Sequence, residues 1–379
     1  MKIVVAIDSL KGSLTSIEAG NAARSGILKA DRTAEVIVRP LADGGEGTME
    51  ALVSGLGGEL ISLRVQGPLE EKVTAQYGYI KETKTAIIEM AAAAGITLVH
   101  HDKRPLDATT YGVGELLKDA IGKGCRHFIV GIGGSATNDG GIGMLQALGY
   151  EFLEEDGKQI PSGAKGLARI AEISDNNILP ELRECQFQIA CDVTNPLCGI
   201  NGATYIYGPQ KGVTEELKDT LDKDMLHYGQ VAAEFTGKDF ISAEGAGAAG
   251  GLGFAFLTFL NGVLQSGIEL VMKAVKLEES MQNADYVVTG EGRLDYQTAM
   301  GKGPVGVAKM GKKNGAVTIA LAGSIASGAE KCNEEGIDSY FPILTQIVTL
   351  DEAMKPETAK ENIERTAEQI FRLICAKKS

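Results

Sequence analysis

The chain of 379 residues contains no tryptophan and is poor in proline and histidine, with ten and four residues respectively. Its six cysteines form no CxxC pair, and no two histidines have the spacing of metal ligands, so neither a disulfide framework nor a zinc site is indicated. No long basic run occurs and the net charge is −13, which argues against nucleic-acid and anionic-membrane partners. The apolar run at residues 1–8 ends at an aspartate and is too short for a signal peptide or a membrane span. We therefore expect a cytoplasmic protein with reduced, mostly buried thiols and small-molecule partners.

Three catalytic signatures are also missing. No GxSxG nucleophile elbow occurs, which argues against a serine hydrolase. The glycine-rich loop GIGGSATNDGG does not match the phosphate-binding pattern GxxxxGK[ST]. The turn after the first apolar run reads DSLKGS rather than GxGxxG, which weakens the case for a dinucleotide-dependent dehydrogenase.

The length predicts two domains, because single domains commonly hold roughly 150 residues. Apolar, β-branched runs alternate with helical patterns at residues 2–8, 35–39, 128–131, 286–289 and 317–322, which predicts an α/β fold with parallel sheet. Ser13, Thr15 or Ser16 is expected to cap the first helix. Residues 59–88 alternate between polar and apolar, as antiparallel strands do. We predict one discontinuous domain at residues 1–60 plus 285–379, a mixed-sheet α/β insert at residues 61–284, and an active-site cleft between them.

Polar, glycine-rich loops follow apolar strands, which is where open α/β sheets bind ligands. They lie at residues 40–48, 131–141, 191–199, 245–253 and 289–304. Asp43 and Glu46 in the first loop suit Mg²⁺, and the amides of the second suit phosphate oxygens at a helix N-terminus. Structural alternatives are tight turns for the glycines, a surface ion pair between Arg293 and Asp295, and a capping role for Asp192.

The turn after the first strand contains Asp8, Ser9 and Lys11. A lysine opposite Asp8 could neutralise that carboxylate or a phosphoryl group in transfer. Phosphoryl transfer needs basic side chains, loop amides, a divalent cation and a carboxylate for the acceptor hydroxyl. Because the loops supply residues of each kind, the sequence points to a phosphotransferase.

Taken in order, the motifs DSLKGSLTSIEA, PLADGGEGT, GIGGSATNDGG, CDVTNPLCG, GPQKG and TGEGRLDYQTAMGKGP resemble bacterial glycerate kinases of the first class over nearly the whole chain. The resemblance implies two unlike α/β domains, of which the discontinuous one is Rossmann- or flavodoxin-like. It also implies that the chain phosphorylates D-glycerate with ATP and Mg²⁺, generally to 2-phosphoglycerate, in the breakdown of glycolate, glyoxylate or sugar acids. Three alternatives stay open: a kinase that forms 3-phosphoglycerate, a kinase for another small hydroxy acid, and a regulator that binds without catalysis. The oligomeric state also stays open, and a homodimer is one option.

The resemblance also suggests site roles, which we state as hypotheses. Residues of one loop are expected to hold an anion, either the ATP phosphates or the glycerate carboxylate: Gly133, Gly134, Ser135, Ala136, Asn138 and Asp139. Three residues are assigned to catalysis, with the first as base for the acceptor hydroxyl: Asp192, Lys11 and Asp8. Four residues are assigned to substrate binding, with Arg293 on the carboxylate: Ser9, Asn195, Arg293 and Asp295. Two are assigned to the metal: Asp43 and Glu291.

Overall fold

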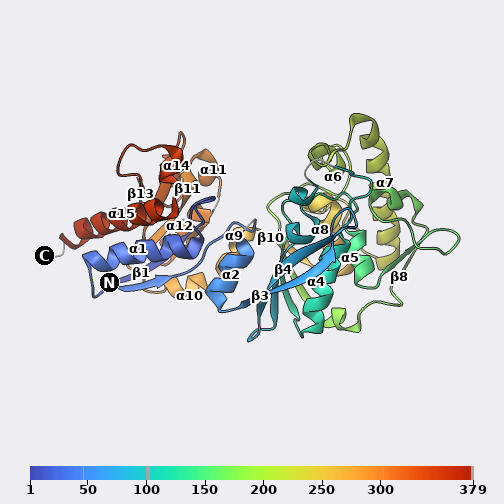
Figure 1. The fold of residues 1–379 in the computed structure, drawn as a ribbon, viewed down its shortest axis with the longest axis horizontal. Helices are drawn as coiled ribbons and strands as arrows, with labels where there is room; N and C mark the ends of the chain where they lie inside the picture. Colours follow the sequence, from blue (N-terminus) through green and yellow to red (C-terminus); the bar gives the residue numbers. More distant parts are fainter. Residues whose placement is uncertain (46, 100–102, 302, 377–379) are drawn as a thin grey trace. The chain divides into compact units, whose positions relative to one another are not determined.

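The computed structural model describes residues 1–45, 47–99, 103–301 and 303–376 of the protein (Figure 1). The chain forms two compact units. The first unit contains Met1–Asp43, Glu50–Gly57 and Ile268–Ser379, and the second contains Gly44–Met49 and Gly58–Gly267. The insert predicted at residues 61–284 shares residues 61–267 with the second unit, whereas residues 268–284 belong to the first.

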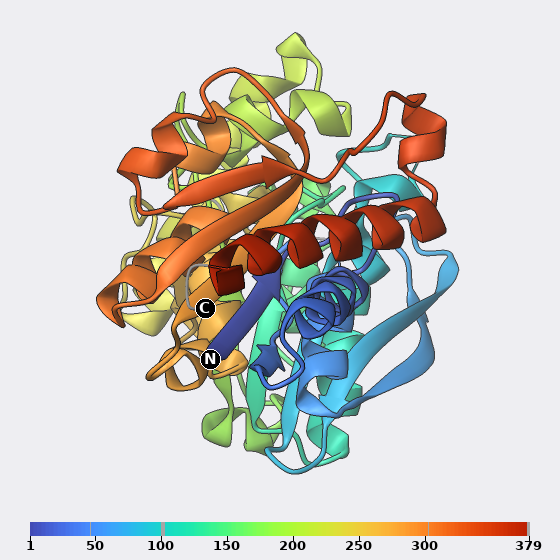
Figure 2. The ribbon, with the colours of Figure 1, turned by 90° about the vertical axis from the view of Figure 1, so that its left-hand side faces the viewer.

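A parallel sheet of five strands forms the centre of the first unit, in the order β13-β12-β11-β1-β2. Its strands are β1 (Lys2–Ile7), β2 (Glu35–Val38), β11 (Tyr286–Leu294), β12 (Val317–Ile325) and β13 (Ser339–Pro342). Figure 2 shows the dark-blue N-terminal strand and the orange strands of the C-terminal part in one sheet, with red helix α15 in front. Strands β11 and β12 extend beyond the apolar runs that predicted them.

Helices cover both faces of this sheet. Helices α1 (Ser16–Ala30) and α15 (Pro356–Ala376) pack on each other over one face, and α12 (Gly303–Lys313) packs on the other. Successive strand residues point to opposite faces, so Leu321 packs in the apolar cluster under α1 and α15, whereas Ala320 packs in the cluster under α12. The remaining helices are α2 (Thr48–Leu56), which begins in the second unit, α9 (Gly267–Ala274), α10 (Leu277–Met281), α11 (Tyr296–Ala299), α13 (Lys331–Glu334) and α14 (Leu350–Ala353).

The start of α1 agrees with the sequence prediction. Thr15 is the N-cap, its side chain accepts a hydrogen bond from the Glu18 amide, and the Glu18 side chain accepts one from the Thr15 amide. This reciprocal capping box satisfies two amides that the helix leaves without partners. Ser16, the other helix-capping option next in sequence, is thereby left for a different contact.

The second unit contains a mixed sheet of six strands in the order β10-β9-β6-β5-β4-β3. Strands β3 (Glu59–Gln66), β4 (Lys72–Ile80) and β5 (Thr85–Glu89) pair antiparallel, as the alternating pattern predicts. Strands β5, β6 (His127–Gly131), β9 (Gln186–Ala190) and β10 (Val263–Gln265) pair parallel, so the sheet is mixed. The predicted fold class, with a parallel sheet and a mixed sheet, is confirmed.

The other elements of the second unit surround a large apolar cluster. They are α3 (Ala91–Ala94), η1 (Ile96–Leu98), α4 (Tyr111–Gly122), α5 (Ile142–Ala147), β7 (Glu151–Leu153), η2 (Ala164–Arg169), β8 (Glu172–Ser174), η3 (Pro180–Glu184), α6 (Ala203–Tyr207), η4 (Pro209–Lys211), α7 (Glu215–Thr236) and α8 (Ala248–Phe259). Among the described helices, none is both long and apolar enough to cross a membrane. All six cysteines are free thiols, but only Cys125 and Cys332 are buried, so the expectation of mostly buried thiols is wrong.

Parallel pairing places the candidate loops at one edge of each sheet. In the first unit, β2 lies on one side of β1, while β11, β12 and β13 follow on the other side. The winding direction therefore reverses between β1 and β11, and open α/β sheets bind ligands beyond the carboxyl ends of strands at such a point. Asp8 follows β1, and Glu291 lies near the end of β11.

The approach of α1 to α15 gives a first test. A Cβ atom added to Gly26 would lie 2.1 Å from the carbonyl oxygen of Glu364. We expect Gly26→Ala to lower the free energy of unfolding by about 1–3 kcal/mol, because overpacking outweighs the gain in helix propensity. Denaturant unfolding followed by circular dichroism measures this change.

Gly122→Ala is the matched control, because a Cβ atom there would meet nothing within 4 Å. It should leave stability unchanged or slightly raised. If Gly26→Ala proves as stable as the unmodified protein, the helices can separate at no cost and our account of their packing is wrong.

Candidate functional site

Asp8 is a buried carboxylate at the switch point of the first unit. It is 8 % exposed, and its Oδ1 accepts a hydrogen bond of 2.6 Å from the Ser9 amide. Burial, together with the negative charges of Asp43 and Glu291, raises the pKa of Asp8 to about 7. Three acids predicted for the site therefore lie close enough to influence one another.

Lys11 lies on the same edge but nearer another acid than expected. Its Nζ atom is 3.6 Å from Oδ2 of Asp43, and its side chain is 70 % exposed. Its positive charge lowers the pKa of Asp8 only as the smallest of the contributions. Lys11 thus stands beside Asp43 rather than directly opposite Asp8, where a mobile, solvated ammonium can reach an incoming anion.

Ser16 connects two segments at this edge of the sheet through hydrogen bonds, a role that the sequence analysis did not predict. The Ser16 hydroxyl donates to the carbonyl of Ile7 at 2.6 Å and accepts from the amide of Leu41 at 2.8 Å. It therefore joins the end of β1 to the loop after β2, just before Asp43. Since Ser16 is 3 % exposed, these bonds are shielded from water.

Around the end of β11, two predicted residues take different roles. Asp295 caps α11 by accepting hydrogen bonds from the amides of Gln297 and Thr298 at 2.8 and 3.4 Å. The Thr298 hydroxyl donates to Glu291 at 2.5 Å. Arg293 is exposed and lies 3.7 Å from Asp295. The carboxylate of Asp295 is thus occupied by the helix cap, whereas Arg293 presents its charge to solvent.

The acids of the first unit suit a shared cation better than a complete protein cage. Within the described ranges, no three His, Cys, Asp or Glu side chains are placed to hold a metal ion on their own. Mg²⁺ usually takes one or two carboxylates and completes its shell with water and phosphate oxygens. The repulsion that raises the pKa of Asp8 is of the kind a divalent cation relieves. Glu46, also named from the sequence, lies outside the described residues.

In the second unit, the loop at residues 131–141 follows β6. Gly133 and Gly134 are exposed, and their amides donate to no other described residue. The Ala136 amide, which we expected to bind an anion, instead donates to the carbonyl of Ala94 at 2.9 Å. Ser135 is 7 % exposed and lies between these two parts of the loop. The accessible donors are therefore confined to its first half.

The polar residues of the second half are buried. The carboxylate of Asp139 accepts from the amide and hydroxyl of Thr110, both at 2.8 Å, and from the amide of Gly141 at 3.1 Å. Burial raises the pKa of Asp139 and these donors lower it. Asn138 donates to the Thr204 hydroxyl at 3.0 Å. Both side chains are buried, and their bonds to Thr110 and Thr204 shape the loop from within.

The glycine-rich loop at residues 245–253 supports the loop at residues 131–141. Ala249, Gly250 and Gly251 have positive φ angles, and the Gly140 amide donates to the carbonyl of Gly250 at 2.9 Å. A Cβ atom at Gly250 would lie 2.0 Å from the carbonyl oxygen of Thr137. Glycine is required here because two backbones touch, which favours a supporting role over ligand binding.

Asp192 lies on the same edge as the exposed amides of Gly133 and Gly134. It follows β9, which pairs with β6 in a register that sets Ala190 beside Gly131. Its side chain is exposed, and Oδ1 accepts from the Gly267 amide at 3.1 Å. This bond orients the carboxylate while water and small molecules still reach it.

Asn195, in contrast, serves its own loop. Its Oδ1 accepts from the Tyr207 hydroxyl at 2.6 Å, and its Nδ2 donates to the carbonyl of Asn201 at 2.8 Å. Both ends of the amide are therefore engaged within the segment that follows β9. Asn195 was predicted to contact substrate, and in the structure its side chain holds the loop after β9 in place.

Lys211 is the main feature that the sequence analysis left without a role. It is 2 % exposed, and its Nζ donates to the Ser135 hydroxyl at 2.7 Å and to the carbonyl of Thr137 at 2.6 Å. Burial lowers its pKa to about 7, with the negative charge of Asp139 acting in the opposite direction. The sequence feature that could have pointed to Lys211 is the motif GPQKG, in which glycines and a proline surround a lone lysine.

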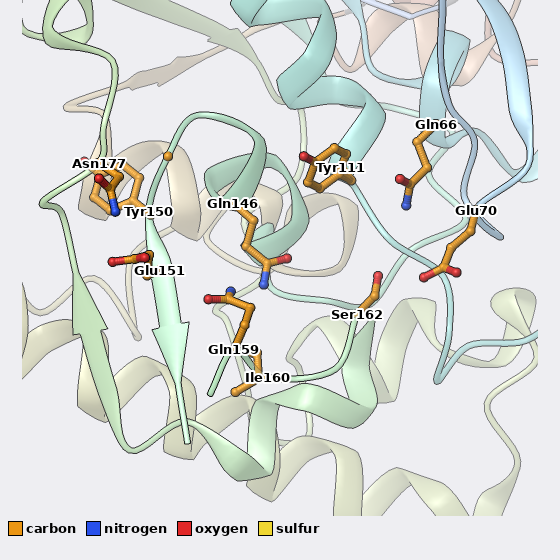
Figure 3. A pocket seen from close by; sticks show the side chains of 11 residues that line it. Gln66, Glu70, Tyr111, Gln146, Tyr150, Glu151, Gln159, Ile160, Ser162 and Asn177 are labelled. Carbon is orange, nitrogen blue, oxygen red and sulfur yellow. The ribbon is translucent and has the colours of Figure 1, made fainter. Parts of the chain in front are cut away.

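A pocket of about 460 Å³ lies elsewhere in the second unit (Figure 3). Its lining is rich in amide and carboxylate side chains, including Gln66, Glu70, Gln146 and Gln159, and it contains none of the predicted site residues. Sites for small molecules are usually lined by apolar surface with a few polar groups. The presence of this pocket is therefore no evidence that the functional site lies here rather than at the loops of the sheet edges.

Comparisons with known proteins agree on one family. A family model described as the glycerate kinase family matches residues 3–375. The glycerate kinase of Bacillus subtilis (strain 168) is 46% identical over 371 residues, covering 98% of this chain and 97% of the relative. The glycerate 2-kinase of Escherichia coli (strain K12) is 45% identical over 371 residues, with the same coverage. A crystal structure of a provisionally named glycerate kinase 2 from Salmonella typhimurium LT2 has a TM-score of 0.92 and 41% identity, covering 100% of this chain and 99% of that one.

The acid cluster of the first unit gives a second test. We expect Asp43→Asn to lower the pKa of Asp8 from about 7 because one neighbouring negative charge is lost. The pKa should stay above the ordinary range for aspartate, since burial is its largest cause. A pH titration of carboxyl carbon-13 shifts measures it directly.

The control is Asp285→Asn, at the opposite end of the same sheet, where Asp285 accepts from the Lys2 amide. That variant should leave the titration of Asp8 in place. If Asp43→Asn also leaves it in place, the two carboxylates do not interact as described.

Proposed function

Because the chain belongs to the glycerate kinase family, we propose that it transfers the γ-phosphoryl group of ATP to the 2-hydroxyl of D-glycerate. The chain is an enzyme of the kinase class, and a kinase takes ATP as its co-substrate. The observation that carries the choice of product is the 45% identity, over 98% of the chain, to a relative named glycerate 2-kinase. The product would then be 2-phospho-D-glycerate. The six free thiols support a cytoplasmic location as part of the proposal.

In the first unit we assign the charged edge to the phosphates and their cation. Asp43 and Glu291 would hold Mg²⁺ together with phosphate oxygens and water, while buried Asp8 tunes the local charge. When bound, the cation neutralises charge on the oxygens of the transferred group. We assign exposed Lys11 to a phosphate and exposed Arg293 to a carboxylate, since both side chains are cationic and reach solvent.

In the second unit we assign Asp192 as the base and the first half of the neighbouring loop as the anion site. Asp192 is exposed and oriented by the Gly267 amide, which suits a group that takes up a proton from substrate. The amides of Gly133 and Gly134 donate to no other described residue, so both N–H groups can donate hydrogen bonds to an anion.

The proposed reaction is a single displacement at phosphorus. The oxygen of the 2-hydroxyl forms a bond to the γ-phosphorus, and the bond from that phosphorus to the bridging oxygen of ADP breaks. The hydroxyl proton passes to Asp192, which later releases it to solvent. Positioning and charge neutralisation, rather than covalent chemistry of the protein, supply most of the rate gain.

The product distinguishes the proposal from its alternatives. Phosphorus NMR of the products from D-glycerate, ATP and Mg²⁺ should show a 2-phosphoglycerate signal that is absent without the acceptor. A 3-phosphoglycerate signal would overturn the assigned position on the substrate while keeping the kinase. No acceptor-dependent ADP would exclude D-glycerate, and a panel of other small hydroxy acids would then be tried.

The role of Asp192 can be tested with a nearly isosteric change. Asp192→Asn keeps an oxygen that can accept from the Gly267 amide but removes the base. We expect kcat to fall by about 100- to 10,000-fold with little change in KM, measured by coupled ADP release.

Asp175→Asn, which changes an exposed aspartate in the loop after β8, serves as the control and should retain normal turnover. Near-normal kcat in Asp192→Asn would show that another group takes the proton.

A further inference from the structure

Lys211 binds the back of the loop at residues 131–141 from a fully buried position. Its ammonium reaches two points of the loop, the hydroxyl of Ser135 and the carbonyl of Thr137, at 2.7 and 2.6 Å. Lys211 ends the short helix η4, and Asn138 in the same loop bonds to Thr204 of α6 just upstream. The GPQKG segment therefore fixes the half of the loop that adjoins the exposed glycines.

Burying a lysine in this place costs stability. A buried ammonium loses its hydration, and an apolar side chain of similar length would fill the same space without that cost. Lowering the pKa to about 7 leaves Lys211 divided between its charged and neutral forms near neutrality. A group kept at this cost, next to loop donors that face solvent, is more simply explained by function than by packing.

The charges around Lys211 offset this cost only in part. Asp139 is the charged group that acts on Lys211, and its carboxylate is already engaged by Thr110 and by amides of its own loop. Tyr228, which faces Asp139, has a pKa raised by burial and is neutral. Lys103 packs its Cβ near Gly212 while its side chain is exposed. When protonated, the ammonium therefore places beneath the loop a positive charge that Asp139 offsets only in part.

The hydrogen bond to Ser135 has a direction. The Ser135 oxygen accepts from Lys211, so its own hydrogen is left to be donated elsewhere. A hydroxyl polarised by an ammonium is a stronger donor than a free one. With the amides of Gly133 and Gly134, it can form a set of three donors along the accessible part of the loop.

We propose that Lys211 is a positioning residue for anion binding, which directs the Ser135 hydroxyl and the amides of Gly133 and Gly134 toward an oxyanion of the substrate. The inference rests on the proposed function, because that function makes this loop the anion site. The ligand group is a carboxylate or a phosphate, which share the chemistry of oxygen atoms that accept several hydrogen bonds. Lys211 does not touch the substrate and acts through Ser135.

Two variants test this inference in the full-length chain. Lys211→Met fills the space without charge, and Lys211→Arg restores a permanent charge. In Lys211→Met we expect KM to rise roughly 10- to 100-fold for one substrate, with a smaller change in kcat. A rise for D-glycerate would assign its carboxylate to the loop, whereas a rise for ATP would assign the phosphates.

The pH dependence gives a readout that a structural role would not change. In the unmodified protein the affected KM should rise between about pH 7 and pH 9 as Lys211 loses its proton. That rise should be absent in both variants, and Lys211→Arg should recover part of the affinity at high pH.

Phe128→Leu is the matched control for lost stability, because Phe128 is buried against Phe187 at the other end of β6 from the loop. It should lower Tm without altering either KM or its pH dependence. If Lys211→Met behaves like Phe128→Leu, or if the pH dependence persists without the lysine, the proposal is overturned.

Calorimetric binding of D-glycerate and of ATP, each alone, separates this inference from the proposed reaction. A loss of at least tenfold in affinity for one of them in Lys211→Met would support the inference even if the product were not 2-phosphoglycerate. Equal affinities in Lys211→Met and the unmodified protein, or no binding of either by the unmodified protein, would refute it.

Discussion

The parallel pairing of β1 with β11 is the contact on which the first unit depends. It joins strands from opposite ends of the sequence, and Lys2 and Asp285, 283 positions apart, hydrogen bond at its beginning. At the other end, the amide of Asp8 donates to the carbonyl of Gly290 at 2.9 Å. Because this register sets Asp8 beside Glu291, a shift by one residue would turn one carboxylate away from the edge. The clustering of carboxylates at this edge therefore follows from strand register.

Much of the fold could be predicted because its strands are apolar and β-branched and its turns are rich in glycine. The strand at residues 2–8 follows from a short-range pattern, and so does a cap at Ser13, Thr15 or Ser16, of which the structure uses Thr15. The extensions of β11 and β12 could not be predicted, since GEGRL and AGSI carry polar and small residues that are held by neighbouring strands. Domain limits were harder still, because residues 268–284 have helical patterns that suit either unit.

The candidate site divides in the same way. Polar loops after parallel strands led to Asp8, Asp43 and Asp192, since topology fixes where such loops lie. The same rule cannot separate exposed polar residues from buried ones, so Asp139 was grouped with the ligand contacts although its bonds are internal. The role of Lys211 could not be predicted because its partner Ser135 is 76 positions away in the sequence, and local patterns carry no information over that separation.

The chain passes between the units four times, because Gly44–Met49 belongs to the second unit while the segments on either side belong to the first, and Gly58–Gly267 again belongs to the second. Strand β1 is therefore synthesised early, together with β2, but it lacks its other partner β11 until the whole of the second unit has been made. During translation the second unit can complete its sheet first, while β1 keeps an unpaired edge. Exposed strand edges favour aggregation, so the apolar run at residues 3–7 is the segment that chaperones would have most reason to shield on the ribosome.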